Sequence, residues 1–406
     1  MLSAHSCNCC GSPVEPLLDL GAHPIANQLT ESAQDTALKY PMSVAGCTYC
    51  GLVQLSLPID SSLFYTDYAT PSAWKPEPHI NNLIEALRPI LPRESRVLDI
   101  GCNDGKFLRH LLADGWRNVT GLEPTRNTAE AAIIQGLTVI GESLNPAVAE
   151  QLVVERGPWD CISLRQVLEH IVDLDGFGRS LNRLLVDNGL LVIEIPDSRV
   201  NLSGRDYALW EEHVNYFTPE TLGAFLTGHG FEVSTSYVSQ FSGVCLTVLA
   251  RKVREPVGET AKDCVLSTEV LAEQVGAFRI WAQGFNKFKS RVRDEIAEHA
   301  SHGEVILYGV GSRSSNFINI MDLAQFVTFA VDDQPQKQDK FMPGSGIPIL
   351  SSEEAEMRLS SSAFLLLGVN GENEESLLAS STLLRGRSFA SVLPPSTHLL
   401  KAWDSL

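Results

Sequence analysis

Two Cys-x-x-Cys pairs near the start of the chain have the residue types and spacing of a metal site. Cys7 and Cys10 form the first pair, and Cys47 and Cys50 form the second. Each pair places two thiolates on one side of a tight turn, and two such turns complete a tetrahedral shell of four sulfurs, which suits zinc. Four protein ligands leave no open position for a substrate, so the pattern predicts a structural zinc ion. Cys9 competes with Cys10 for this role, but Cys10 has the required offset from Cys7.

The segment VLDIGCNDGKF, residues 97–107, is a candidate cofactor site. It is typical of a strand, a glycine turn and the start of a helix, whose N-terminus offers free amide donors. Gly101 and Gly105 allow the backbone to come close to a ligand. Asp99 and Asn103, in the same segment, are polar groups that can bind the ligand or hold the turn. We therefore predict a nucleotide-type cofactor at this turn.

An acidic residue at the end of the next expected strand narrows the identity of the cofactor. Glu123 stands where an acid binds a ribose diol in nucleotide-binding sheets. A dinucleotide site favours G-x-G-x-x-G, whereas this turn is G-x-x-x-G, which favours S-adenosylmethionine over NAD. Together with the later segments WDCISLRQVLEHIVDL and LLVDNGLLVIEIPD, the region resembles the class I methyltransferases. That resemblance places the methionine end of the cofactor near Gln166. A Rossmann-like fold with another ligand is the alternative.

A histidine next to a carboxylate is a candidate general base. The segment LWEEHVNYF, residues 209–217, follows an expected strand and brings Glu212, His213 and Tyr216 close together beyond the carboxyl edge of the sheet. Ligands of open α/β sheets bind along this edge. A histidine beside a glutamate can serve as a base near neutral pH. The alternative is a structural histidine in a loop, and a structural role is also the prediction for His170.

These residues need a sheet to position them, and the apolar runs predict one. Strands and helices alternate along the middle of the chain in the way that is typical of a parallel sheet with helices on both faces. A closing antiparallel pair is expected at residues 231–237 and 244–250. The expected strands are Val97–Ile100, Val119–Leu122, Leu137–Ile140, Cys161–Leu164 and Leu190–Ile195, and the expected helices are Ile80–Leu91, Lys106–Asp114, Thr128–Gln135, Ala147–Glu155 and Phe177–Leu185.

A second α/β region follows. It begins with a long helical pattern that has little Gly or Pro. The pattern covers Val265–His299, and strands are expected at Glu304–Tyr308, Phe326–Val331, Phe364–Leu367 and Phe389–Val392. We therefore predict an α/β protein with three domains. They are a small zinc-binding domain at residues 1–72, a class I methyltransferase domain with a Rossmann-like sheet at 73–252, and a Rossmann-like substrate-binding domain at 253–406.

The composition excludes several classes of partner. The 406 residues carry a formal net charge of −18 and no basic run, which argues against nucleic acid because phosphate neutralisation needs clustered Lys and Arg. The longest apolar stretches are too short for a bilayer, and the N-terminal residues lack the pattern of a secretory signal. Nine cysteines, four of them in metal-like pairs, fit a reducing cytosol better than a disulfide framework. We therefore expect a cytoplasmic enzyme with a small-molecule substrate.

Nearly the whole chain resembles the sugar C-methyltransferases of deoxysugar and antibiotic biosynthesis. The matching pieces are the two cysteine pairs, DIGCNDG, EHVNYF and the run from YGVGSRSS to KQDKFMPGSGIPI. Members of this family methylate nucleotide-linked 4-keto sugars and have a zinc domain, an S-adenosylmethionine domain and a C-terminal Rossmann-like domain. The resemblance implies that His213 is the base, with Glu212 beside it. It also implies a tyrosine from the end of the zinc domain, for which FYTDYATPSAW offers Tyr68, with Tyr65 nearby.

The sequence departs from the family pattern at three positions. Thr70 stands where the family often has a second tyrosine, and Trp210 stands where it often has a tyrosine three residues before the base. Tryptophan can neither act as an acid nor accept a hydrogen bond. In the C-terminal glycine turn Arg313 replaces a lysine that faces phosphate, and its hydrogen-bond geometry differs. These positions bear on which sugar is bound.

The expected function is methylation of carbon 3 of a nucleotide-linked 4-keto deoxysugar. The ketone acidifies the proton on carbon 3, His213 removes it, Tyr68 donates to the enolate oxygen, and the carbon takes a methyl group from S-adenosylmethionine. Tyr65, Tyr216 and Arg313 are the expected substrate contacts. Two alternatives remain open. One is O-, N- or C-methylation of another small natural product, and the other is a non-catalytic protein that binds S-adenosylmethionine.

Overall fold

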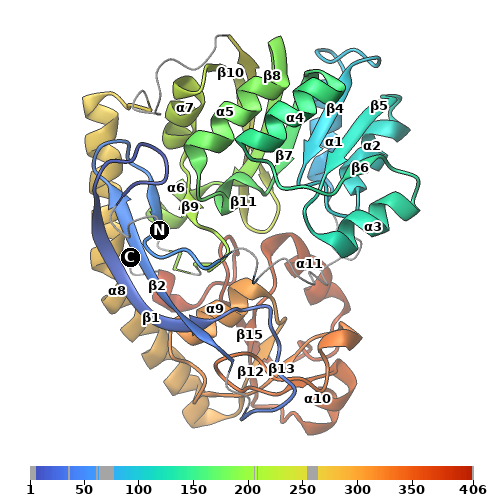
Figure 1. Cartoon of the computed structure of the whole chain (residues 1–406). Coiled ribbons are helices and arrows are strands. Elements are labelled where there is room, and N and C mark those ends of the chain that lie inside the picture. The colour runs from blue at the N-terminus through green and yellow to red at the C-terminus, as the bar shows by residue number, and fades with distance from the viewer. Residues whose placement is uncertain are drawn as a thin grey trace.

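The structure is a computed structural model, and it describes residues 6–34, 37–60, 63, 77–204, 206–207, 209–253 and 264–404. Figure 1 shows a central α/β part in cyan and green, a C-terminal α/β part in orange and red, and a blue N-terminal part that lies along both. Each of the three parts has its own β-sheet.

The central part contains a seven-stranded sheet in the order β10-β11-β8-β7-β4-β5-β6. β11 is antiparallel to both of its neighbours, and the other pairs are parallel. This arrangement confirms the predicted α/β fold with its closing antiparallel pair. The strands are β4 (Arg96–Ile100), β5 (Asn118–Leu122), β6 (Val139–Ile140), β7 (Trp159–Arg165), β8 (Leu185–Pro196), β10 (Phe231–Gln240) and β11 (Val244–Lys252). The helices are α1 (His79–Leu87), α2 (Lys106–Ala113), α3 (Arg126–Ile134), α4 (Pro146–Arg156), α5 (Leu174–Leu184), α6 (Ser198–Gly204) and α7 (Pro219–Gly228).

The carboxyl ends of β4 and β7 form the switch point of this sheet. From β4 the chain continues to β5 and β6 on one side of the sheet. It then crosses to the other side of β4, where it forms β7 and β8. Reversal of strand order leaves a crevice beyond the carboxyl ends, where ligands of such sheets bind. Both strands are buried along most of their length, because the apolar runs of a parallel sheet are covered on both faces.

The C-terminal part contains a five-stranded parallel sheet in the order β14-β13-β12-β15-β16. Its strands are β12 (Val305–Tyr308), β13 (Val327–Val331), β14 (Ile349–Leu350), β15 (Phe364–Leu367) and β16 (Ser388–Ser391), and its helices are α8 (Thr268–His302), α9 (Ser312–Ile320), α10 (Ser352–Arg358) and α11 (Gly371–Ser380). The 35 residues of α8 confirm the predicted long helix, and its N-cap is Ser267. Within the described ranges no helix is long and apolar enough to cross a bilayer.

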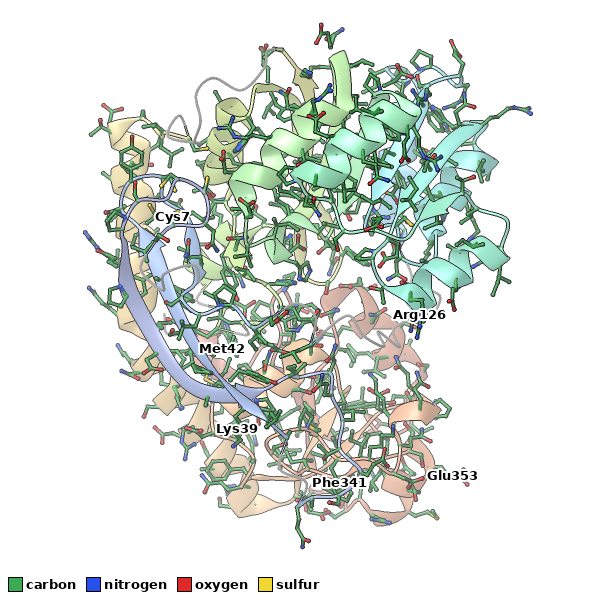
Figure 2. All side chains as sticks on the ribbon, in the orientation of Figure 1. Cys7, Lys39, Met42, Arg126, Phe341 and Glu353 are labelled. Atoms are coloured by element: carbon green, nitrogen blue, oxygen red, sulfur yellow. The ribbon has the colours of Figure 1, made fainter. Side chains whose placement is uncertain are left out.

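The N-terminal part forms a sheet that the sequence patterns do not predict. A long antiparallel hairpin of β1 (Val14–Pro24) and β2 (Lys39–Cys47) is extended by β3 (Val53–Leu55). The fourth strand, β9 (Asn215–Tyr216), comes from the central part and pairs with β3. Proline and glycine within β1 hide the strand from pattern recognition. In Figure 2, Cys7 lies at the end of this sheet near the central part, and Lys39 lies at the opposite end, towards Phe341 of the C-terminal part.

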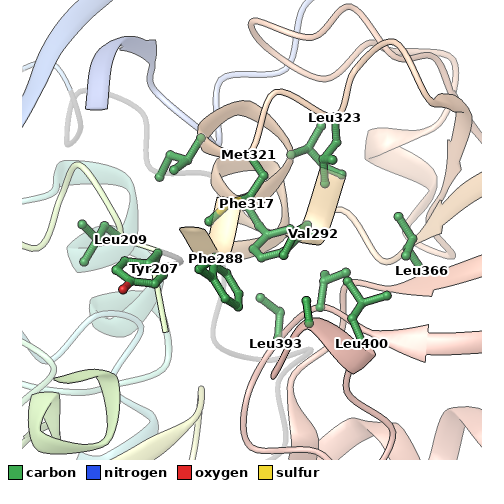
Figure 3. Packing of buried hydrophobic residues seen from close by; sticks show 14 of the residues in the cluster. Tyr207, Leu209, Phe288, Val292, Phe317, Met321, Leu323, Leu366, Leu393 and Leu400 are labelled. Atoms are coloured by element: carbon green, nitrogen blue, oxygen red, sulfur yellow. The ribbon is translucent and has the colours of Figure 1, made fainter. Parts of the chain in front are cut away.

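One apolar cluster joins all three parts. Tyr207 and Leu209 of the central part belong to the same cluster as Phe288 of α8 and Phe317 of α9 (Figure 3). The cluster also contains Val44 of β2. Burial of this shared apolar surface holds the parts together. The central and C-terminal parts each also have an apolar cluster of their own, whereas the apolar clusters that contain residues of the N-terminal part are shared with the other parts. The predicted domain borders after residues 72 and 252 remain predictions.

Candidate functional site

Four buried thiols form the candidate zinc centre. The Sγ atoms of Cys7 and Cys50 lie 3.5 Å apart, and those of Cys10 and Cys47 lie 3.6 Å apart. All four sulfurs are within 4.8 Å of one another. A tetrahedral shell with zinc–sulfur bonds of about 2.3 Å has edges of about 3.8 Å, so this group fits a zinc ion. Cys9 is a buried free thiol outside the four-thiol group.

Both cysteine pairs are held by the same backbone pattern. In the first, the Cys7 N–H donates to the Ser12 carbonyl at 2.8 Å, and the Gly11 N–H donates to the Cys7 carbonyl at 2.9 Å. The second pair repeats both bonds around Cys47, at 2.8 and 3.0 Å. The thiols are therefore presented by two matching turns. A zinc ion with this closed shell stabilises the fold and does not contact substrate.

The glycine turn lies at the carboxyl end of β4, next to the switch point. Gly101 and Gly105 have φ values of 70° and 79°, a left-handed conformation that favours glycine. A Cβ on Gly105 would come within 2.0 Å of the Leu137 side chain, so the turn has no room for a larger residue. Helix α2 begins directly after Gly105, and its first backbone N–H, that of Lys106, donates to the Asp104 carboxylate at 3.2 Å.

Two carboxylates lie beside this turn. Glu123, just after β5, accepts hydrogen bonds from the backbone N–H groups of Asn103 at 2.9 Å and Thr125 at 2.8 Å. Asp99 in β4 accepts one from the Ser163 hydroxyl in β7 at 2.6 Å, and burial raises the pKa of Asp99 to about 6. The structure thus brings the predicted cofactor residues of β4, β5 and the turn together. An acid for a ribose diol next to a glycine turn fits S-adenosylmethionine.

Gln166 follows β7 on the other side of the switch point. Its φ is 55°, and its N–H donates to the Glu194 carbonyl at 2.7 Å. Its side-chain amide contacts Cys245 Sγ at 3.1 Å. The left-handed backbone turns the chain away from the strand at the edge where ligands bind. A contact with the methionine end of the cofactor remains a prediction for this residue.

A buried charged cluster at the same edge escapes the sequence motifs. Arg165, the last residue of β7, lies 2.7 Å from a Glu77 oxygen and 3.4 Å from a Glu194 oxygen. The Lys106 amine lies 3.2 Å from Glu77, and His79 Nε2 lies 3.2 Å from Glu194. Burial acts to raise the pKa of Glu77, but the Arg165 and Lys106 charges outweigh it, so the pKa lies below its usual value. The sequence feature that could have revealed this cluster is a charged residue at the end of an apolar strand.

The segment that carries the candidate base is tied to the sheet of the N-terminal part. Besides the pairing of β9 with β3, the Leu55 N–H donates to the Val214 carbonyl at 2.9 Å. The Asn215 side chain donates to the Ile171 carbonyl at 2.6 Å and accepts a hydrogen bond from the Asn8 amide at 3.0 Å. The zinc-binding sheet therefore positions this segment.

Glu211 ties the same segment to the other two parts of the molecule. One oxygen of its buried carboxylate accepts a hydrogen bond from the Ala26 N–H at 2.6 Å. The other accepts one from the Asn316 amide of α9, also at 2.6 Å. Burial raises the pKa of Glu211, and the two donors partly offset that effect. The local sequence does not distinguish the structural role of this glutamate from the role of its neighbour Glu212.

His213 lies against His170. The centroids of the two rings are 5.0 Å apart and the rings are nearly perpendicular, at 83°. The ring of Trp210 is 4.6 Å from that of His213. His170 ends a short 3-10 helix, Leu168–His170, that follows β7, so the contact places His213 at the carboxyl edge of the central sheet. Burial lowers the pKa of His170 to about 4, so this histidine is neutral at physiological pH.

The side chain of Glu212 accepts a hydrogen bond from the Asn27 amide at 3.1 Å. Burial raises the pKa of Glu212 to about 8, and the like charge of Glu211 adds to the shift. A carboxyl group with this pKa is protonated at neutral pH. Burial raises the pKa of the nearby Glu169 to about 8 as well. The predicted role of Glu212 as the partner of the His213 imidazole remains a prediction.

The aromatic residues predicted to contact substrate are only partly described. The hydroxyl of Tyr216 is buried and donates to the Trp210 carbonyl at 3.3 Å, so it holds the loop before the candidate base. Tyr65, Tyr68 and Thr70 lie outside the described residues.

Arg313 links the C-terminal part to the central part. Its guanidinium pairs with Asp206 at 3.1 Å and donates to the carbonyls of Ser242 at 3.2 Å and Pro394 at 3.0 Å. It also donates to the Asn370 side chain at 3.1 Å. Its side chain is 14% exposed. These bonds make it a link between parts, and its predicted contact with a substrate phosphate remains a prediction.

Three family models match successive parts of the chain. They describe a zinc binding domain at residues 7–65, a methyltransferase domain at 76–236 and a C-methyltransferase C-terminal domain at 244–389. The C-methyltransferase NovU of Streptomyces niveus is 26% identical over 368 residues, which are 86% of this chain and 86% of that protein.

Two further similarities cover less of the chain. The ubiquinone biosynthesis O-methyltransferase of Caulobacter sp. strain K31 is 30% identical over 154 residues, which are 34% of this chain and 60% of that protein. A solved structure of a SAM-dependent methyltransferase from Anabaena variabilis has a TM-score of 0.37 and 16% identity, over 48% of this chain and 96% of that one.

Proposed function

We propose a sugar substrate for this chain, which is an S-adenosylmethionine-dependent methyltransferase and belongs to the family that joins zinc-binding, methyltransferase and C-methyltransferase C-terminal domains. The proposed reaction is methylation of carbon 3 of a nucleotide-linked 4-keto deoxysugar. The contact between His213 and His170 is the observation that supports it. It sets a histidine from outside the sheet at the edge where the cofactor is expected.

In this proposal His213 acts as the base. A ketone at carbon 4 acidifies the proton on carbon 3, and a ring nitrogen of His213 takes that proton. When bound, S-adenosylmethionine supplies the sulfonium methyl group that the resulting enolate carbon takes up. The residues proposed to hold the cofactor are Asp99, Gly101, Asn103, Gly105, Glu123 and Gln166.

The other groups at the site orient the reactants and exclude water. Trp210 and His170 contact the candidate base and limit the positions that its imidazole can take. The enolate oxygen needs a hydrogen-bond donor, and the family pattern assigns this role to Tyr68. Tyr65, Tyr216 and Arg313 are proposed to contact the sugar or its diphosphate.

Methylation of oxygen or nitrogen in another small molecule is the second candidate function. One relative of this chain is named as an O-methyltransferase, so dependence on S-adenosylmethionine does not select the acceptor atom. The match to the C-methyltransferase C-terminal domain supports carbon.

Hydrogen exchange at carbon 3 tests the proposal without methyl transfer. The protein is incubated in heavy water with S-adenosylhomocysteine and a thymidine diphosphate 4-keto deoxysugar, and deuterium in the sugar is followed by mass spectrometry. Wild type is expected to exchange one proton next to the ketone. His213→Asn is expected to abolish exchange, and His398→Asn, which changes an exposed histidine, is expected to retain it.

Calorimetry with S-adenosylhomocysteine separates loss of the base from loss of the fold. His213→Asn is expected to bind it with wild-type affinity, because the glycine turn belongs to another segment. Exchange that persists in His213→Asn would show that another group is the base. Methylation of the sugar without any exchange in wild type would favour an oxygen acceptor.

A further inference from the structure

A second group of metal-binding side chains surrounds the candidate base. Glu169, His170 and His213 each offer one ligand atom, and these atoms lie within 4.8 Å of one another. The group is separate from the four-thiol centre. Glu169 is 1% exposed, whereas the two histidines are half-buried. The group therefore combines one buried carboxyl group with two half-buried histidines.

The carboxyl group of Glu169 needs a partner. Among the described residues neither of its oxygens has a hydrogen-bond partner. Burying a polar group without a partner is costly, and a buried carboxylate normally pairs with a cation or binds a metal. Glu211 is equally buried, yet both of its oxygens accept short hydrogen bonds. The contrast indicates that Glu169 is available to bind a group that the described residues do not supply.

The imidazole of His170 is oriented as in metal sites. Its Nδ1 lies 2.8 Å from the carbonyl oxygen of Glu212. A carbonyl can only accept, so Nδ1 carries the proton and Nε2 keeps its lone pair. Metal-binding histidines almost always donate their other ring N–H to a carbonyl or carboxylate, which sets the tautomer and the ring orientation. The hydrogen bond that typically orients a metal-binding histidine is therefore already present at His170.

We propose that Glu169, His170 and His213 bind a divalent first-row transition metal ion. Two histidines and one carboxylate form the ligand set of open metal sites, in which water or another small molecule fills the remaining positions. Zinc, cobalt and nickel suit imidazole with carboxylate. This site differs from the structural centre in its ligands, its open positions and its place at the sheet edge.

Occupation of this site has a consequence for catalysis, and only this consequence rests on the proposed function. The ion takes the lone pair of His213, so the same imidazole cannot accept the proton from carbon 3. Metal binding and proton abstraction are therefore alternative states of one site. A divalent metal is expected to inhibit the enzyme in proportion to its occupancy.

Cobalt titration of the full-length protein, prepared with one zinc ion per chain in the four-thiol centre, tests the metal site directly. Wild type is expected to bind one further equivalent of Co²⁺, with the weak visible absorption of cobalt bound by nitrogen and oxygen. Glu169→Gln is expected to weaken this binding by about tenfold or more. His170→Gln, which removes an imidazole, is a second variant with the same expectation. Glu232→Gln, an exposed carboxylate change on β10, is the matched control and is expected to titrate like wild type.

The outcomes distinguish the site from the structural centre. Intense thiolate-to-cobalt absorption as the only change would mean that cobalt exchanges into the four-thiol centre, and the proposal fails. It fails too if no band develops, or if both variants bind cobalt as wild type does. A zinc content of one per chain verifies that each variant is folded.

Proton exchange in the same samples separates the two proposals. Loss of the carbon 3 exchange in step with cobalt occupancy supports His213 as the shared residue. Undiminished exchange at full occupancy would show that His213 is not a ligand. Absence of cobalt binding together with normal exchange would overturn the metal site and leave the methyltransferase mechanism intact.

Discussion

The Glu211 carboxylate accepts a hydrogen bond of 2.6 Å from the side-chain amide of Asn316, a residue 105 positions further along the chain. Its second oxygen accepts a hydrogen bond from the Ala26 N–H, so one buried side chain of the central part joins the N-terminal and C-terminal parts. His213 is only two residues away. The junction of the three parts and the candidate base therefore share one loop.

Replacing Asn316 with leucine is expected to weaken this junction. The variant leaves a Glu211 oxygen buried without its donor, which should lower the free energy of unfolding by about 1–3 kcal/mol. Turnover should fall while S-adenosylhomocysteine binding stays unchanged, because the glycine turn lies elsewhere. Urea denaturation and calorimetry measure the two effects. The control is Asn118→Ala, which removes an exposed hydrogen bond to Glu94. Equal losses of turnover and cofactor binding would contradict the role assigned to the junction.

The cysteine assignment can be tested with two adjacent substitutions. Cys10→Ser removes a ligand of the four-thiol centre and is expected to abolish zinc binding, as measured by metal analysis. Cys9→Ser is the matched control and is expected to keep one zinc per chain. Loss of zinc should also speed hydrogen exchange of the Leu55 amide, which bonds to the Val214 carbonyl next to the candidate base. Zinc loss in the Cys9 variant, with retention in the Cys10 variant, would reverse the assignment.

Glu123→Gln is expected to weaken binding of S-adenosylhomocysteine. The variant replaces a carboxylate, the proposed acceptor for the ribose diol, with a neutral amide, and hydrogen bonds to charged groups contribute about 1.5–3 kcal/mol. This corresponds to a decrease in affinity of roughly 10- to 150-fold, which calorimetry can measure. The control is Glu130→Gln, an exposed change on α3. Equal affinities of the two variants would argue against a ribose contact for Glu123.

The ion pairs of Glu77 are expected to make stability depend on pH. The pKa of Glu77 in the folded protein lies below its usual value of 4.5, so the folded state favours the charged form. The stabilisation is therefore complete above pH 4.5 and is lost as the pH falls through the lower folded value. The difference in unfolding free energy between wild type and Glu77→Gln should be constant above pH 4.5 and shrink below it. Denaturation at a series of pH values measures this, and a pH-independent difference would contradict the prediction.

Local patterns in the sequence determined the two Rossmann-like sheets and the zinc centre. The run Leu190–Ile195 lies within β8, and Phe364–Leu367 coincides with β15. A buried parallel strand needs a short continuous apolar run, and a cysteine knuckle needs two thiols at a fixed offset. Both signals lie within a few adjacent residues. Such local signals can be recognised without knowledge of the tertiary contacts.

Pairing between distant segments was decided only by the tertiary structure. The sheet of the N-terminal part takes β9 from residues that follow the whole parallel core of the central part. A two-residue strand has no periodicity of its own, and it forms because β3 offers it backbone hydrogen bonds. The sequence predicts that His213 lies beyond the sheet edge. Only the structure shows that the pairing of β9 with β3 holds the segment of His213 in place.

The roles of the acidic residues were also decided by the fold. Glu211 and Glu212 are adjacent and chemically alike, yet Asn316 and Ala26 bind the first, whereas Asn27 binds the second. Glu169, a third buried glutamate near them, has no such donor among the described residues. Burial and hydrogen-bond partners set the charge of a carboxyl group, and both come from residues far apart in the chain. Spacing along the sequence therefore identified the candidate base, and three-dimensional contacts assigned the glutamates around it.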